Sequence, residues 1–249
     1  MTVVRGERAA LQNISLRIES GEHVCILGPN GCGKSTLIKT ITRECYPLAR
    51  EHSAMRILGR ERWDIFELRT RLGIVSPDLL ASCTTDSTGR DVVLSGFFSS
   101  TRIFPHHHPD ANHLQRANAA LARLGIGHLA ERPLLHMSSG EAKRALIARA
   151  LVHQPETLLF DEPSSALDIA AQLQLRGTMR ELARSGLAIL LVTHHVNEII
   201  PEIDRVIMLR EGEILIDGPK QEVLTKDNLS RLFGVEVRIH QHQGSFYIY

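Results

Sequence analysis

Long hydrophobic runs are missing from this sequence of 249 residues. The longest, Leu187–Val192, is far shorter than the roughly 20 apolar residues that a membrane-spanning helix needs, and we interpret it as a buried strand. The N-terminus also lacks a charged and then apolar leader that would mark the chain for secretion. The simplest interpretation is a cytosolic protein with one large α/β domain.

Paired cysteines and excess charge are missing too. The four cysteines, Cys25, Cys32, Cys45 and Cys83, show no CxxC spacing and indicate no disulfide framework, as expected for a reduced compartment. The formal net charge is +1, so the composition gives no electrostatic reason to expect a nucleic-acid partner.

Short apolar runs alternate with helical patterns along the chain. Continuous apolar runs of this length are typical of strands buried on both faces of a parallel sheet, and they occur at Val24–Leu27, Thr157–Phe160, Leu187–Val192 and Val206–Leu209. Between them, the apolar residues of Ala142–Leu151 share one helical face, from which Lys143, Arg144 and Arg149 are excluded. These patterns predict an α/β fold with a mostly parallel sheet.

Two stretches depart from this alternation. Leu79–His136 is rich first in Ser and Thr, then in His and Pro, and becomes helical at Asn112–Leu124. The tail, Val235–Tyr249, alternates like edge strands and predicts an antiparallel hairpin. We therefore expect a single domain with a core at about 1–78 and 137–234, an inserted helical subdomain at about 79–136 and a strand extension at about 235–249.

The sharpest local signal is the segment Gly28–Ser35, which matches GxxxxGK[ST] between an apolar strand and a helical pattern. Glycines let successive backbone N–H groups point at an anion at a helix N-terminus, where the helix dipole favours negative charge. Lys34 is expected to reach the β- and γ-phosphates of ATP, and the Ser35 hydroxyl to bind Mg²⁺. The predicted phosphate-binding residues are Gly28, Pro29, Asn30, Gly31, Cys32, Gly33, Lys34, Ser35 and Thr36.

Two acids follow the apolar run Thr157–Phe160. A carboxylate at a strand end suits the metal-holding position of P-loop ATPases, so Asp161 is the second predicted Mg²⁺ ligand. Glu162, directly after it, is placed to polarise an attacking water and is the predicted catalytic base. Together with the phosphate loop, this pair predicts an ATPase with a P-loop NTPase core.

Three further motifs resemble those of the ATP-binding-cassette (ABC) ATPases. Met137–Glu141 and the helical pattern after it resemble the LSGGQ signature, Ser165–Asp168 resembles the D-loop, and Thr193–His194 resembles the switch histidine. The motifs occur in the family's order, and the resemblance extends from about Leu11 to Gly218.

The resemblance implies a cassette that pairs head to tail with a second copy, or with a homologous cassette subunit. Each ATP is then held between the phosphate loop of one subunit and Ser138, Ser139 and Gly140 of the other, with Asp168 nearby. His194, whose neutral imidazole can donate to the γ-phosphate, joins Glu162 as a catalytic residue. A transmembrane permease subunit is the implied partner, with the cassette peripheral on the inner face of the membrane.

Several positions depart from the family's pattern. The usual Gly-Gly of the signature is Ser139-Gly140, and the glutamine expected after Ile74-Val75 is replaced by Ser76–Asp78. The aromatic residue that stacks on adenine has no counterpart at Val3–Arg5, although Arg5 itself can stack on a base. The segment Gly89–Phe98 and the missing glutamine resemble the sequences of a branch of ABC ATPases linked to molybdenum or metal transport.

Other interpretations remain open at this point. The energising subunit of a membrane importer competes with a soluble ABC ATPase that remodels a complex such as an iron–sulfur scaffold. The apolar residues Phe97, Phe98, Ile103 and Phe104 suit either a groove for a permease helix or buried core. Cys32 is either a reactive thiolate beside Lys34 or a small packing residue. His106, His107, His108 and His113, and the pair His240 and His242, are weak candidates for a transition-metal site.

Overall fold

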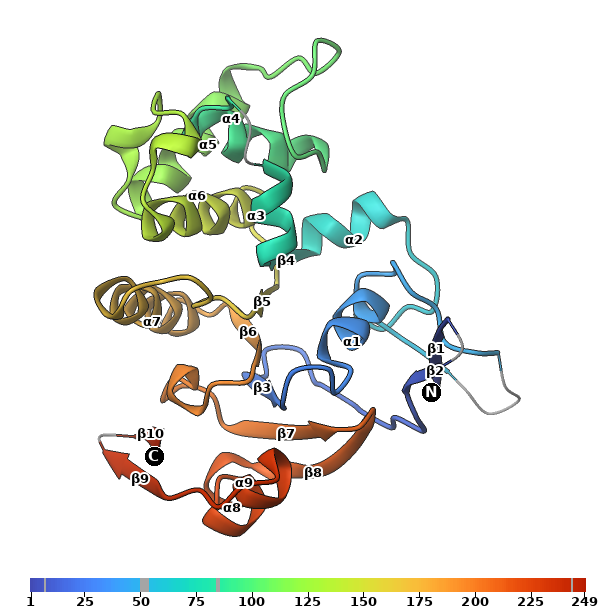
Figure 1. The fold of residues 1–249 in the computed structure, drawn as a ribbon. Helices are drawn as coiled ribbons and strands as arrows, with labels where there is room; N and C mark the ends of the chain where they lie inside the picture. The colour runs from blue at the N-terminus through green and yellow to red at the C-terminus, as the bar shows by residue number, and fades with distance from the viewer. Residues whose placement is uncertain (7, 50–53, 84–85, 243) are drawn as a thin grey trace. The chain divides into compact units, whose positions relative to one another are not determined.

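The computed structural model describes residues 1–6, 8–49, 54–83, 86–242 and 244–249. The chain forms two compact units (Figure 1). The first comprises Met1–Leu68 and Ala188–Tyr249, and the second comprises Arg69–Leu187.

The first unit is built around β3 (Val24–Leu27), which pairs in parallel with both β6 (Ala188–Thr193) and β7 (Arg205–Arg210). The antiparallel strand β8 (Glu213–Pro219) pairs with β7. Every residue of β3 and β6 is buried, which is why both read as uninterrupted apolar runs. β8 is half-exposed or exposed along its whole length, as expected of a strand at the edge of a sheet.

The remaining elements of the first unit surround these strands. Its hairpins are β1 (Val3–Arg5) with β2 (Arg8–Leu11) and β9 (Ile239–His242) with β10 (Ser245–Ile248). Its helices are α1 (Lys34–Ile41), the 3-10 helix η4 (Val196–Glu198), α8 (Lys220–Val223) and α9 (Lys226–Phe233). Helix α2 (Ile65–Arg71) begins in the first unit and ends in the second.

The second unit pairs β4 (Leu72–Val75) in parallel with β5 (Thr157–Asp161). Helices α4, α5 and α6 pack against one another (Figure 1). The α-helices are α3 (Pro77–Cys83), α4 (Gly89–Ser95), α5 (Ala111–Arg123), α6 (Ser139–Leu151) and α7 (Ile169–Arg184). The 3-10 helices are η1 (Gly96–Phe98), η2 (Gly127–Leu129) and η3 (Leu134–His136).

Local sequence explains where these helices begin. Helices α4, α5 and α6 each start at a capping box. In each, the side chain of the cap residue accepts a hydrogen bond from the backbone N–H three residues later, and the side chain of that later residue accepts one from the backbone N–H of the cap residue. The cap residues are Thr88, Asp110 and Ser138. Helix α1 begins differently, at Gly33 with a φ of 109°, which only glycine adopts without strain.

The four predicted buried strands are confirmed, with bounds that agree or differ by one residue at one or both ends. One detail of the prediction was wrong. The tail does not become a strand until Ile239, because Val237 is buried and its N–H donates to Ser230 Oγ at 3.1 Å, which holds this segment on α9. In α6, Lys143 lies outside the predicted apolar face and is nevertheless buried, with Nζ 3.5 Å from Ser165 Oγ. Burial on most sides of the helix left little room for a polar face.

Within the described ranges, no helix is both long and apolar enough to cross a membrane.

Candidate nucleotide site

The residues from Gly28 to Gly33 form a tight loop between β3 and α1, and Lys34 and Ser35 begin the helix. A Cβ atom on Gly28 would lie 2.2 Å from the carbonyl oxygen of Leu209 on β7. A Cβ atom on Gly33 would lie 2.6 Å from the carbonyl oxygen of Ala10. Both positions therefore admit only glycine, because backbone approaches within the distance that a side chain needs. Gly28 and Gly33 are therefore required by tertiary packing as well as by access to an anion.

Lys34 lies in the first turn of α1 with its side chain buried. Its Nζ donates to the carbonyl oxygens of Gly28 and Pro29 at 2.8 and 3.0 Å. The ammonium group is thus held at the loop itself, next to the backbone of its first two residues. A cation and a helix N-terminus at one loop form an electrostatic environment that favours a phosphate.

Gly212 supports the loop from the turn between β7 and β8, and sequence reasoning missed it. Its N–H donates to the carbonyl of Cys32 at 2.9 Å, and its carbonyl accepts from Gln12 N at 2.7 Å. Its φ of 81° and its closeness to Ala10 require glycine here also. The sequence signal was a glycine between two apolar runs, which indicates a turn without indicating what the turn contacts.

His194 directly follows β6 and is half-buried, whereas His195 is exposed. The two rings lie 3.8 Å apart between centroids. The carbonyl of Thr193 accepts from the backbone N–H of Gly28 at 3.2 Å. The residue before His194 is therefore hydrogen-bonded to the first residue of the phosphate loop.

In the second unit, Asp161 is the last residue of β5 and Glu162 follows it. Glu162 has a φ of 45°, in the left-handed region. For a residue with a Cβ atom this conformation costs about 1–2 kcal/mol, and strain of this kind is concentrated at functional sites. The two carboxylates are adjacent in sequence, but only Glu162 has the left-handed backbone conformation.

The signature segment and Asp168 both occupy helix starts in the second unit. Ser138 caps α6, and its backbone N–H donates to Glu141 at 2.8 Å, which holds the pKa of that carboxyl below its usual value. Ser138 and Ser139 are exposed. Asp168 caps α7 and accepts from Ala171 N at 2.7 Å. A Cβ atom on Gly140 would lie 3.2 Å from Ala171 Cβ, so the start of α6 lies close to the start of α7.

The positions that depart from the family pattern have local structural roles. Ser76 is buried, and its Oγ accepts from Leu79 N at 3.2 Å at the start of α3. Asp78 is exposed in the first turn of that helix. Arg5 is exposed on β1, opposite Arg8 on β2.

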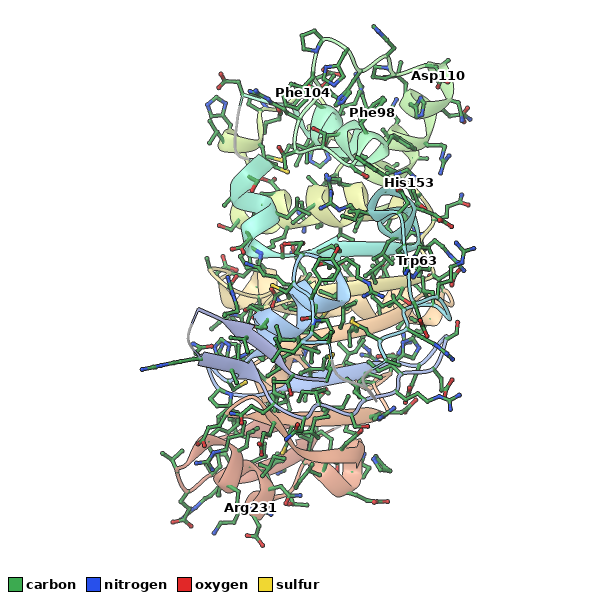
Figure 2. All side chains as sticks on the ribbon, turned by 90° about the vertical axis from the view of Figure 1, so that its right-hand side faces the viewer. Trp63, Phe98, Phe104, Asp110, His153 and Arg231 are labelled. Carbon is green, nitrogen blue, oxygen red and sulfur yellow. The ribbon has the colours of Figure 1, made fainter. Side chains whose placement is uncertain are left out.

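The histidine-rich stretch packs against phenylalanines, two of which, Phe98 and Phe104, are labelled in Figure 2. The ring of Phe98 stacks on His107 at 4.4 Å, Phe104 contacts the same ring at 5.5 Å, and Phe97 lies 4.5 Å from His113. These phenylalanine side chains are half-buried, so they are more exposed than the fully buried residues of the core. Over the part of the chain that the structure describes, no group of three His, Cys, Asp or Glu side chains is arranged to hold a metal ion. The metal-site hypothesis therefore gains no support.

A glycine-rich loop that holds a lysine at a helix N-terminus is the phosphate-binding element of P-loop nucleotide-binding proteins. The family model of the ABC transporter matches residues 11–165. A hemin import ATP-binding protein of Bradyrhizobium diazoefficiens, HmuV, is 32% identical over 98% of this chain and 90% of its own length. The chain belongs to the ABC transporter family, as an ATP-binding subunit that hydrolyses ATP.

Solved structures agree with this assignment. A transporter described as of the metal-chelate type, in an inward-facing conformation, is 27% identical with a TM-score of 0.73 over 96% of this chain and 89% of its own. A dimeric bacterial ABC transporter cassette, MJ0796, is 27% identical with a TM-score of 0.70 over 88% of this chain and 94% of its own. The predicted α/β fold with a mostly parallel sheet and antiparallel strands is thereby confirmed.

The environment of Cys32 leads to a first prediction. Its side chain is 4% exposed, and a Cβ atom on Gly28 would lie 2.6 Å from its Sγ. Because a buried sulfur is inaccessible to reagents, we expect iodoacetamide to modify Cys32 much more slowly than the half-exposed Cys45. Mass spectrometry of the alkylated peptides over time measures both rates. Modification of Cys32 as fast as Cys45 would favour the reactive-thiolate interpretation, and protection by MgATP would strengthen it.

Proposed function

We propose that this chain energises an importer by pairing with a second copy of itself around two ATP molecules. The observation that carries the proposal is the phosphate loop, in which Lys34 Nζ is held 2.8 Å from the Gly28 carbonyl at the start of α1. The family assignment, and the dimeric cassette to which the chain is similar, support pairing. In this proposal Ser138, Ser139, Gly140 and Asp168 of one copy complete the ATP site of the other.

The hydrolytic roles rest on position and chemistry. Glu162, which follows β5 in a left-handed conformation, acts as the general base toward water. His194 donates to the γ-phosphate, and the residue before it, Thr193, is hydrogen-bonded to the phosphate loop. Ser35 is exposed in the first turn of α1, and Asp161 presents a carboxylate at its strand end. Hydroxyl and carboxylate oxygens are the ligands that Mg²⁺ prefers, so each of these residues has the chemistry to hold the ion. When bound, Mg²⁺ neutralises charge on the β- and γ-phosphates.

The cargo of the transporter is proposed to be a metal chelate or hemin. The similarity to a hemin import protein and to a metal-chelate transporter supports this class, and molybdenum is not favoured over it. We further propose that residues 79–136 act as the helical subdomain that receives a transmembrane permease subunit, with the cassette peripheral at the inner face of the membrane. The half-buried phenylalanines Phe97, Phe98 and Phe104 lie in this stretch.

Pairing is tested by blocking hydrolysis. With Glu162→Gln and MgATP, we expect monomers to become dimers, because two occupied composite sites can no longer be emptied. Multi-angle light scattering with and without ATP measures the change in mass, and ADP serves as the control. A second variant adds Ser138→Arg to Glu162→Gln, which places a bulky cation at the exposed cap residue of α6. We expect this variant to stay monomeric, although Lys34 is unchanged. A Glu162→Gln protein that binds ATP and stays monomeric would contradict the proposal.

A further inference from the structure

We propose that the C-terminal hairpin β9–β10 positions His194 for ATP hydrolysis by packing on η4, with Phe246 as its positioning residue. The inference rests on the proposed role of His194. It concerns only the first unit, in which the hairpin, η4, His194 and the phosphate loop all lie.

The hairpin packs on the segment that follows the switch histidine. Strand β10 contacts η4, and Figure 1 shows the red hairpin beside the short orange helix after β6. Phe246 on β10 is 4% exposed, whereas its neighbours Tyr247 and Ile248 are 38% and 37% exposed. A Cβ atom on Gly244 would lie 3.5 Å from Pro201 Cβ, so the hairpin turn also lies against this segment.

The segment from His194 to Ile203 has no regular sheet partner of its own and depends on packing. Val196, Ile199 and Ile200 are fully buried. At the far end of the segment, Lys220 Nζ donates to the carbonyl of Pro201 at 2.8 Å. The hairpin contacts the segment at η4, close to His194, as well as at Pro201. Removing the buried aromatic side chain of β10 leaves a cavity into which a neighbouring segment can relax.

A short chain of contacts links this packing to the phosphate loop. Helix η4 begins two residues after His194, and His195 N donates to Thr193 Oγ1 at 2.9 Å. Thr193 in turn accepts from Gly28 N at 3.2 Å. Only His195 separates His194 from η4, so a shift of η4 is expected to move His194. The hydrogen bond from Gly28 N to the Thr193 carbonyl is expected to keep the phosphate loop in place. The expected consequence is impaired hydrolysis with retained ATP binding.

The test compares Phe246→Ala with Tyr247→Ala, which removes an exposed aromatic from the same strand. We expect Phe246→Ala to lower kcat about tenfold, below the roughly 100-fold that an ångström-scale misplacement can cost, with an unchanged KM for ATP. Tyr247→Ala should behave as wild type. Phe246→Leu, which retains most of the apolar volume, should recover most of the rate and also serves if the alanine variant fails to fold.

The double variant with His194→Ala separates positioning from general stability. If Phe246 acts through His194, Phe246→Ala should lower the single-turnover rate no further once His194 is replaced. An equal fall in both backgrounds, or a normal rate for Phe246→Ala beside a slow His194→Ala, would overturn this inference alone. A normal rate for His194→Ala would overturn the proposed role of His194 and the inference with it.

Discussion

Glu162→Gln is expected to lower ATP turnover by about 10²–10⁴-fold, the usual contribution of a general base, while ATP binding is retained. Glutamine keeps the shape of the side chain but cannot accept the proton of the attacking water. The backbone cost of the left-handed conformation at this position, with φ 45°, is the same for both residues. Loss of activity should therefore not be accompanied by loss of stability.

The control for this prediction is Glu211→Gln. Glu211 is also a left-handed glutamate, with φ 51°, but its side chain is exposed in the turn between β7 and β8. The same chemical change there should leave turnover unchanged. Phosphate release at saturating MgATP gives the rate, and calorimetry gives the affinity. Turnover of Glu162→Gln within a few-fold of wild type would exclude Glu162 as the base.

Lys34→Ala is expected to weaken ATP binding by about 10- to 100-fold. Loss of a charge-assisted contact to a phosphate costs roughly 1.5–3 kcal/mol, and about 1.4 kcal/mol corresponds to a tenfold change in Kd. The same Nζ bonds to the Gly28 and Pro29 carbonyls at 2.8 and 3.0 Å, so the variant also loosens the loop that binds the anion. Both effects act in the same direction.

Lys39→Ala is the matched control, since it removes a cation from the last turn of the same helix. Calorimetry of both variants with MgATP, beside thermal melting without nucleotide, distinguishes a lost phosphate contact from a general loss of stability. An unchanged Kd for Lys34→Ala would mean that this loop is not the nucleotide site. Equal weakening by Lys39→Ala would point instead to a long-range effect of charge.

Prediction from the sequence succeeded where the deciding interactions are local. The buried strands β3, β5, β6 and β7 were found because full burial on both faces leaves an uninterrupted apolar run. The phosphate loop was found because anion binding needs glycines, a lysine and a hydroxyl residue at fixed spacing before a helix. The motifs also identified the family before any contact was known.

It failed where a neighbour distant in sequence decides. Lys143 was set outside the apolar face of its helix, yet it is buried near Ser165, because the helix is covered on more sides than its apolar pattern indicates. The strand prediction for the tail began too early, because Ser230 on α9 binds Val237 N.

The sequence by itself determined the family, the phosphate loop and the order of strands and helices, since each depends on residue types at short, fixed spacing. Only the tertiary structure decided why Gly28 and Gly33 admit no side chain, how Gly212 supports the loop, and that the C-terminal hairpin packs on the segment after His194. Those features arise from backbone carbonyls and apolar surfaces that approach from distant parts of the chain. Every residue has a backbone carbonyl, and a phenylalanine has the same side chain wherever it packs. The sequence pattern therefore does not show which distant residue each of these groups contacts.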